Sequence, residues 1–323
     1  MPHSRNHTID LMRLMACPFI LLIHCPLSGE LGQMLIHLGR FGVPFFLLVS
    51  GWFSYAPSTA RMMEKARKKL EDTQVLLGIF CVAYFIMNSL TSYLSGAGCF
   101  SWMSDYVNAK TLASLILFNR ARFLGSTGYY PLMLIYVYLL FLWLLKRNLL
   151  DKAFPCIPML LGIHFALSMW SDLPWYCYGN FLLTGLPLFL LGHWLHRIRP
   201  KLPTKPGVYG CLLLLGMGLV SVESRWNPDG YCYLGSVVMA ASLLLWAVHR
   251  PWQMHSTPQL NMMKRFSMYI FVIHCGVRDI LEAFLNRQQI ALSNNTFVAL
   301  VIAVSLTVCG IWNAAATWGQ PEN

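Results

Sequence analysis

The stretch from Ile9 to Leu27 reads IDLMRLMACPFILLIHCPL and decides how the rest of the chain is interpreted. As a helix it is long enough to cross the hydrocarbon core of a bilayer, which takes roughly 20 mostly apolar residues. It nevertheless contains Asp10 and Arg13 near its beginning and His24 near its end. Ionisable side chains at membrane depth are costly, so this stretch predicts a functional site as well as a membrane span.

The spacing between Arg13 and His24 predicts that the two side chains share one face of the helix. Eleven residues separate them, which corresponds to three turns plus about 20°, with a rise of ~16 Å along the axis. A cation and a titratable imidazole would therefore lie along one wall of the protein. The alternative is that Arg13 extends to the lipid headgroups and His24 only ends an interfacial helix.

The composition places the chain among polytopic membrane proteins. It has 323 residues, of which 56% are hydrophobic and 11% are charged, and its mean hydropathy is +0.52. Soluble domains carry roughly 25% charged residues. We therefore expect one membrane-embedded, all-α domain over residues 1–323. The ten cysteines form no C-x-x-C pair, so neither a zinc site nor a disulfide framework is indicated, and no metal is expected.

Ten apolar segments are candidates for membrane-spanning helices. The segment between the third and fourth, roughly 95–127, is too polar and irregular to cross and is expected to lie partly in the interface. The fifth candidate is short. The ten predicted spans are 9–28, 35–55, 74–94, 128–145, 154–170, 177–196, 207–222, 231–248, 266–286 and 296–315.

The basic residues predict the orientation of the bundle. With the N-terminus inside, 17 of the 24 lysines and arginines fall on the cytoplasmic side. Positive charge collects on the cytoplasmic side of membrane proteins, so both termini are predicted to be cytoplasmic in a multi-pass protein of the cell membrane. The formal net charge of +11 is thus spread over short inner loops and forms no single basic face, which argues against nucleic acid as a partner.

Several polar residues of the predicted spans gather towards the outer side. His24 closes the first span and Arg40 lies in the second. The ninth span places further polar residues on one stripe at i, i+4, i+8 spacing. Such a group suits proton transfer beside an anionic ligand, and the alternative is a set of structural ion pairs between helices. The candidates are His24, Arg40, Glu223, His274, Arg278 and Glu282.

Three stretches, taken together, resemble the acyltransferase-3 family of bacterial integral membrane acyltransferases. The first is IDLMRLMACPFILLIH, similar to the family's opening Arg-x10-His motif. The second, GRFGVPFFLLVSGWF, resembles its second-helix signature, and the third, FSMYIFVIH, its late Tyr-x-x-x-His helix. The order and spacing agree over nearly the whole chain. One departure is STGYYPLML, where the family often has a tryptophan.

The resemblance implies a chemistry and assigns residues to it. The family moves acetyl or other acyl groups from cytoplasmic acyl-CoA to hydroxyls of surface sugars or small molecules. Carried over, His24 is expected to act as general base and Arg13 to bind the acyl donor. From their positions, Arg40 is expected to assist donor binding, Glu223 to orient His24 or the acceptor, and His274 and Arg278 to contact substrate.

Two other functions remain open at this point. The IHCPL and FLLTGLPLFLLG stretches are similar to the membrane half of membrane-bound serine racemases, in which this fold is linked to serine uptake. A transporter of a small polar amino acid would use the same charged vestibule as its binding site. A purely structural membrane subunit fits poorly with so many ionisable groups inside the membrane.

Overall fold

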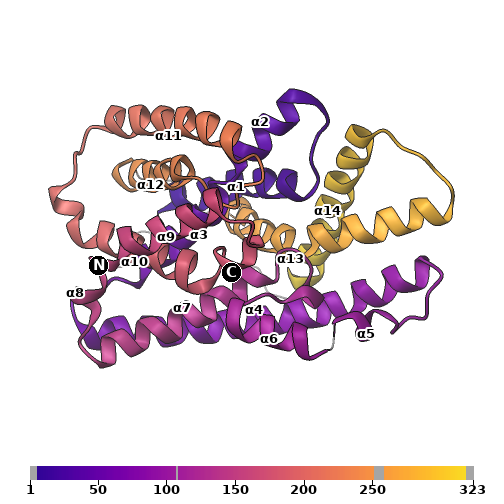
Figure 1. The fold of residues 1–323 in the computed structure, drawn as a ribbon, viewed down its shortest axis with the longest axis horizontal. Coiled ribbons are helices and arrows are strands. Elements are labelled where there is room, and N and C mark those ends of the chain that lie inside the picture. Colours follow the sequence, from indigo (N-terminus) through magenta and orange to yellow (C-terminus); the bar gives the residue numbers. More distant parts are fainter. Residues whose placement is uncertain (1–5, 107, 251–257, 318–323) are drawn as a thin grey trace.

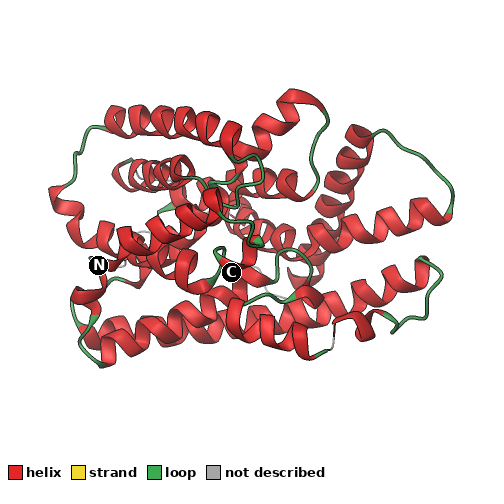
Figure 2. Ribbon diagram, in the orientation of Figure 1, coloured by secondary structure: helices red, strands yellow, loops and turns green. Residues whose placement is uncertain are grey.

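The computed structural model describes residues 6–106, 108–250 and 258–317 (Figure 1). Within these residues every regular element is a helix, and Figure 2 shows no strand among them. Eight of the described helical segments are long and apolar enough to cross a membrane. The predicted all-α polytopic bundle is therefore confirmed. Arg5 and both chain termini, which enter the predicted orientation, lie outside the described residues.

Each of the ten predicted spans coincides with a helix or a helix pair. Two of them fall outside the group of eight: α12, which has only 16 residues, and α13, which carries several charged side chains. The segments are α1 (His7–His24), α2 (Gly29–Gly39) with α3 (Gly42–Ser54), α4 (Thr59–Leu94), α7 (Tyr129–Lys146), α8 (Leu150–Ala153) with α9 (Cys156–Trp170), η3 (Phe181–Gly185) with α10 (Leu186–Ile198), α11 (Pro206–Trp226), α12 (Leu234–His249), α13 (Pro258–Arg287) and α14 (Asn294–Thr317).

The second span differs from the prediction of a continuous helix over 35–55. It begins at Gly29 and breaks between α2 and α3, at Arg40 and Phe41. Pro44 lies in the first turn of α3, where the absence of its N–H costs no helical hydrogen bond. The break puts Arg40 between two helices, where its side chain lines a cavity described below.

The segment between α4 and α7 contains only short helices, as expected for a chain that does not cross. These are α5 (Trp102–Tyr106), α6 (Ala109–Phe118) and η1 (Arg122–Leu124). None approaches the roughly 20 residues that a membrane helix needs. The remaining short elements are η2 (Trp175–Cys177) and η4 (Arg199–Lys201).

Side-chain contacts join the helix ends in the order that alternate crossings predict. The start of α1 meets the end of α12, because the Asn6 side-chain amide donates to the Ala247 carbonyl at 3.0 Å. The end of α1 meets the start of α14, because the Asn294 amide donates to the Pro26 carbonyl at 2.6 Å. We call the end of the bundle where α1 finishes the His24 end.

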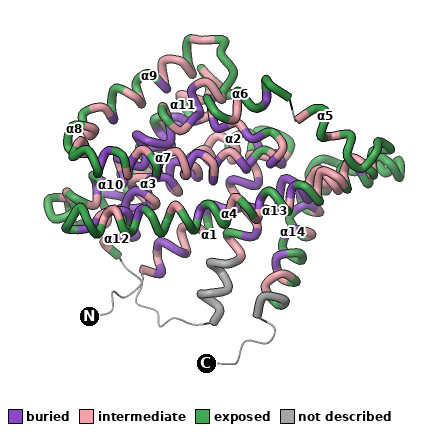
Figure 3. The backbone as a smooth tube through the Cα atoms, turned by 90° about the horizontal axis from the view of Figure 1, so that it is seen from below, coloured by how far each residue is buried: buried purple, intermediate pink, exposed green. Residues whose placement is uncertain are grey.

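The centre of the bundle is built on α3 and α10, which pack closely through glycines. A Cβ at Gly192 would lie 2.0 Å from the Leu48 carbonyl oxygen, and one at Gly51 would lie 1.8 Å from that of Phe189. Leu48 and Phe189 are completely buried. Figure 3 shows buried residues concentrated on α3, α7 and α10, whereas α9 and α11 at the periphery expose much of their length.

Exposed apolar side chains cover the outer helices. Val75, Val82 and Ile86 of α4 are each at least 60% exposed, and Leu214 of α11 and Ile311 of α14 are similarly open. Contiguous apolar surface of this kind marks a face that contacts lipid. The bundle therefore presents hydrocarbon to the bilayer.

Replacing Gly192 by alanine is expected to destabilise the protein strongly, since the new methyl group collides with backbone rather than with a movable side chain. The loss should exceed about 3 kcal/mol, the upper end of ordinary overpacking. Thermal unfolding in detergent measures it. Gly162→Ala on α9 is the control, because a Cβ there meets nothing within 4 Å. Equal melting temperatures for both variants would contradict this account of the α3–α10 contact.

The predicted orientation can be tested with single-cysteine variants and a membrane-impermeant maleimide. Cys99 lies in the α4–α5 connection at the His24 end and is exposed. We expect it to react in intact cells. A cysteine introduced by Glu64→Cys, near the start of α4, should react only after permeabilisation. Labelling of the 61–69 segment from outside would overturn the assignment of the His24 end to the outer face.

Candidate functional site

A cavity of about 540 Å³ occupies the His24 end of the bundle. Its walls come from the end of α1, the α2–α3 break, the segment before α7, the loops around Trp175 and Tyr231, and α13 (Figure 1). Segments far apart in the sequence therefore meet at one place. The histidine, arginine and aspartate residues that line it are His24, Arg40, Arg120, Arg122, Asp229, Arg278 and Asp279.

His24 and His274 form a pair at the wall of this cavity. Their ring centroids are 5.4 Å apart and the rings are tilted by 45°. Nδ1 of His274 lies 2.7 Å from the Ile270 carbonyl oxygen, which can only accept, so Nδ1 carries the proton. In the neutral ring, Nε2 of His274 is then a lone-pair acceptor, and it is buried without a partner among the described residues. His24 itself lines the cavity.

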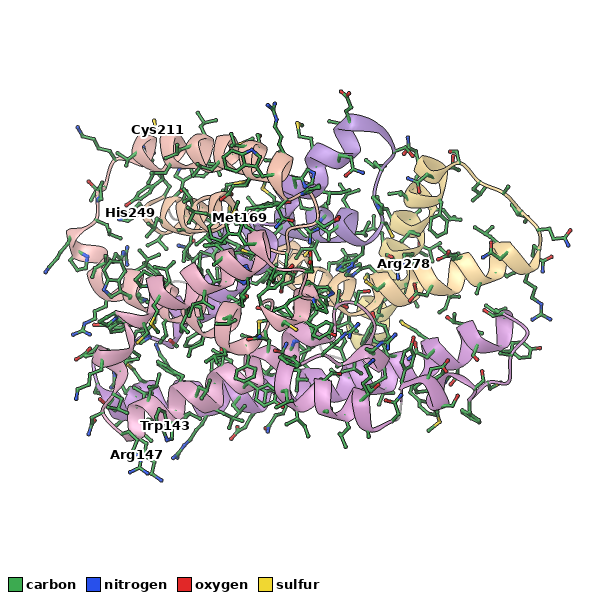
Figure 4. All side chains as sticks on the ribbon, viewed as in Figure 1. Trp143, Arg147, Met169, Cys211, His249 and Arg278 are labelled. Carbon is green, nitrogen blue, oxygen red and sulfur yellow. The ribbon has the colours of Figure 1, made fainter. Side chains whose placement is uncertain are left out.

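Arg278 fixes the end of α1 beside this pair. Its Nη1 donates to the His24 carbonyl oxygen at 2.9 Å. Its Nε and Nη2 donate to Oδ1 of Asp279 at 2.8 Å and 2.5 Å. The neighbouring carboxylate balances the guanidinium charge, and the hydrogen bond to His24 joins α13 to α1. Figure 4 labels Arg278 on α13.

Arg40 faces the same cavity from the helix break. It forms no ion pair within the described ranges, and its Nε is buried without a hydrogen-bond partner there. Arg40 and Arg278 are both close enough to act electrostatically on the His24 imidazole. The geometry thus brings together four of the predicted site residues: His24, Arg40, His274 and Arg278.

Glu223 lies in the last turn of α11 and outside the cavity lining, and its side chain reaches the start of α12. Its Oε1 accepts the backbone N–H of Leu234 at 3.2 Å, and its Oε2 accepts that of Gly235 at 3.0 Å. A carboxylate at a helix N-terminus satisfies unpaired N–H groups and complements the helix dipole. Both oxygens of Glu223 are therefore used by the cap. The expectation that it orients His24 has no supporting contact.

Arg13 lies outside the cavity lining, towards the end of the bundle opposite to the His24 end. Its Nη1 is 3.4 Å from Oδ1 of Asp10, and its guanidinium lies over the Phe53 ring at 5.7 Å from the centroid. Phe53 belongs to the last turns of α3, at the end of the bundle opposite to the His24 end. The separation of Arg13 from His24 along α1 agrees with the helical spacing of the sequence.

Two arginines of the cavity wall, Arg120 and Arg122, carry a site role that sequence reasoning missed. The sequence shows them only as basic residues of an irregular segment. In the structure they flank Ala121, which is 2% exposed, but nothing in the sequence marks this arrangement. Tyr129, Trp175 and Tyr231 form the aromatic part of the wall. The Tyr231 hydroxyl donates to that of Tyr129 at 3.0 Å, so these rings form an ordered wall.

His24, His274 and Cys275 are a group in the described part of the chain that could hold a metal ion. Their ligand atoms lie within 4.8 Å of one another. Imidazole nitrogen and cysteine sulfur are suitable zinc ligands. Arg40, however, has no carboxylate partner in the described part of the chain, and its positive charge near His24 opposes the binding of a divalent cation. The arrangement suits proton transfer better than metal binding.

Comparison with known proteins gives a single kind of match. Residues 6–315 match the family whose description is "acyltransferase domain", the acyltransferase-3 family. No curated protein and no solved structure matches the chain. The match covers α1 to α14, and so includes every helix that borders the cavity. A bundle of membrane-spanning helices with this sequence pattern from end to end is thus a member of the acyltransferase-3 family of membrane acyltransferases.

Proposed function

We propose that the protein transfers an acyl group, acetyl in the simplest case, from cytoplasmic acyl-CoA to a hydroxyl of a carbohydrate or small molecule outside the cell membrane. The observation that supports this most is the position of His24. Its imidazole lines a cavity at the His24 end of the bundle, which the predicted orientation makes the outer end, beside His274 and two arginines. An imidazole near neutrality is the usual general base for a hydroxyl nucleophile.

The distance between the two ends of α3 suits the acyl donor. Val43 lines the cavity at the His24 end, and Tyr55 lines a second cavity of about 320 Å³ at the opposite end. Twelve residues of helix separate them, a rise of about 18 Å. The arm that joins the sulfur of coenzyme A to its first phosphate has the length of four to five extended residues, about 15 Å. The donor can therefore have its phosphates at one end and its thioester at the other.

Cations at the opposite end support the placement of the donor phosphates there. Arg13 lies beside Phe53 at the same depth as the end of α3. Arg197, at the end of α10, lines the second cavity and is paired with Asp151. Arg147 projects outward from the end of α7 (Figure 4). We infer that Arg13 and these inner cations attract the nucleotide half of the donor.

The reaction proceeds by proton transfer and acyl exchange. The acceptor hydroxyl oxygen attacks the thioester carbonyl carbon while His24 takes its proton. The carbon–sulfur bond then breaks, and the leaving thiolate recovers that proton from the imidazolium. Arg40, an unpaired cation in the cavity, stabilises the developing oxyanion. We infer that Nε2 of His274, a lone-pair acceptor without a partner among the described residues, accepts the ring N–H of His24 when the substrates bind and so orients it. Arg278 holds the His24 backbone in place.

Replacing His24 by alanine is expected to lower acyl transfer by about 10²- to 10⁴-fold, the usual contribution of a general base. The release of free coenzyme A from acetyl-CoA, with glucose or glucuronate as acceptor, measures the rate at matched folded protein. His37→Ala is the control, because His37 lies on α2 near the same end but outside the cavity lining. Retention of most activity by His24→Ala would remove the general-base role.

His274 separates a positioning role from a packing role. We expect His274→Ala to lower kcat, and we expect His274→Asn, which keeps a hydrogen-bond acceptor, to recover part of that loss. A side chain that only fills space would show no such recovery. The two variants are compared in the same coenzyme A release assay, and thermal unfolding checks that both are folded.

Coenzyme A is expected to stabilise the purified protein, and Arg13→Ala should weaken that effect. A ligand that binds only the folded state adds about 2.7 kcal/mol at one hundred times its Kd. Melting temperatures across a coenzyme A titration provide the measurement. Arg225→Ala, an exposed arginine at the His24 end, serves as control. A flat curve with coenzyme A, together with a clear shift on adding free serine, would favour an amino-acid transporter.

A further inference from the structure

The cavity at the His24 end contains more positive charge than the acyl donor can use. Arg40, Arg120 and Arg122 line it, and none of them forms an ion pair with a carboxylate in the described part of the chain. Arg278 is balanced by Asp279. Asp229 is the remaining acid of the lining. The site thus keeps an excess of guanidinium groups beside His24.

On the proposed function, the donor brings no anion to this end. The thioester is uncharged, and the phosphates of coenzyme A lie about 15 Å from the sulfur. One cation, Arg40, stabilises the oxyanion that develops on the thioester carbonyl. The charge of Arg120 and Arg122 therefore has no counterpart in the donor, and the counterpart has to come from the acceptor.

The segment that carries Arg120 and Arg122 is held rigidly against the bundle. Asn119 is 1% exposed and adopts a left-handed conformation with φ of 49°. Its side-chain amide donates to the Tyr129 carbonyl at 3.3 Å, and its Oδ1 accepts the Phe181 N–H at 2.8 Å. On the other side, the Asn88 amide donates to the Phe123 carbonyl at 2.8 Å. Both flanks of the segment are fixed.

The two arginines also rest on aromatic rings. The Arg120 guanidinium lies 4.0 Å from the centroid of the Tyr176 ring, and that of Arg122 lies 5.8 Å from the Tyr106 centroid. A guanidinium stacked on a ring keeps its N–H edge free for a planar anion. Binding an anion here requires little further ordering, since backbone and side chains are already placed.

A neighbouring groove of about 490 Å³ is lined by acidic and uncharged polar side chains instead of basic ones. It shares Tyr106 and Asp279 with the cavity, and its lining includes Asp105 and Glu282 but no lysine or arginine. Serine, threonine and asparagine side chains make up much of the rest. This boundary directs an anionic group towards Arg120 and Arg122 and leaves the groove for uncharged, hydroxylated parts of the same molecule.

We infer that the acceptor is a hydroxylated molecule that carries a carboxylate or phosphate, and that Arg120 and Arg122 bind this anionic group. The hydroxyl that reacts then lies towards His24. Guanidinium groups suit both anions because they offer paired, charge-assisted hydrogen bonds. The inference rests on the proposed function for the transfer step, while the binding that it predicts is independent of the donor.

Calorimetric titration of the purified protein with matched sugars tests the inference without any donor. Glucose, glucuronate and glucose 6-phosphate differ only at C6. We expect at least one of the two anionic sugars to bind about tenfold or more tightly than glucose, as charge-assisted hydrogen bonds imply. Arg120→Gln and Arg122→Gln should each remove most of this preference. Comparison of the two anions separates carboxylate from phosphate recognition.

Arg287→Gln is the matched control. Arg287 is also an exposed arginine over an aromatic ring, 5.4 Å from the Tyr93 centroid, but it lies outside the cavity lining. Thermal unfolding without ligand checks the fold of each variant. Dihexanoyl phosphatidylglycerol is a further probe, and its tighter binding would keep the anionic class and place the hydroxyl on a lipid headgroup.

Three outcomes would overturn the inference: no binding of any anionic probe, equal binding of glucose and both anionic sugars, or a preference that survives in both arginine variants. A parallel assay of coenzyme A release distinguishes this failure from that of the proposed function. Anion-selective binding without any acyl transfer would refute the transfer reaction and leave the anion site standing.

Discussion

A guanidinium group inside a membrane protein must find its hydrogen-bond acceptors within the protein, and Arg278 shows what this requirement does to the fold. The acceptors it uses are the Asp279 carboxylate and the His24 carbonyl oxygen. The first keeps the local charge balanced. The second joins α13 to the last residue of α1. The imidazole that the sequence singles out is therefore placed by a contact that also lets a charged residue exist at that depth.

The rest of the site follows from where α1 ends. The His24 ring meets His274 because both helices are tied together at this level. The α2–α3 break opens beside them and admits Arg40. The rigid segment before α7 adds Arg120 and Arg122 to the lining. On the proposed function, a hydroxyl, a thioester and an anion have to be held at once, and separate segments converge for this at an end of the bundle.

Much of the fold was accessible from sequence because hydrophobic length is a strong physical signal. Each of the ten predicted spans coincides with a helix or a helix pair, and the resemblance to the family is confirmed. The relation of Arg13 to His24 was also accessible, since it depends only on helical geometry. The interruption of the second span at Arg40 could not be predicted from the sequence. Pro44, the nearest proline, is also tolerated inside a membrane helix, so its presence does not locate a break.

The contents of the site were harder to predict than the helices. Glu223 was expected near His24, yet its carboxylate caps α12, a local contact that depends on how two helices meet. Arg120 and Arg122 were overlooked because an irregular segment has no periodicity from which to infer a face. Their placement depends on Asn119, whose buried side chain bonds to residues 10 and 62 positions away. Such long-range contacts leave no pattern in a single sequence.

The close contact of α3 with α10 has a consequence for motion. Two helices whose backbones touch through Gly51 and Gly192 cannot slide or separate without losing their packing on both sides. The two helices are therefore fixed relative to each other at the centre of the bundle. We expect the motion that admits one substrate and releases the other product to involve α1, α13 and α14; side chains of α13 and α14 donate hydrogen bonds to the backbone at the end of α1. The protein would then have a fixed part around α3 and α10 and a movable part made of α1, α13 and α14. His24 belongs to the movable part.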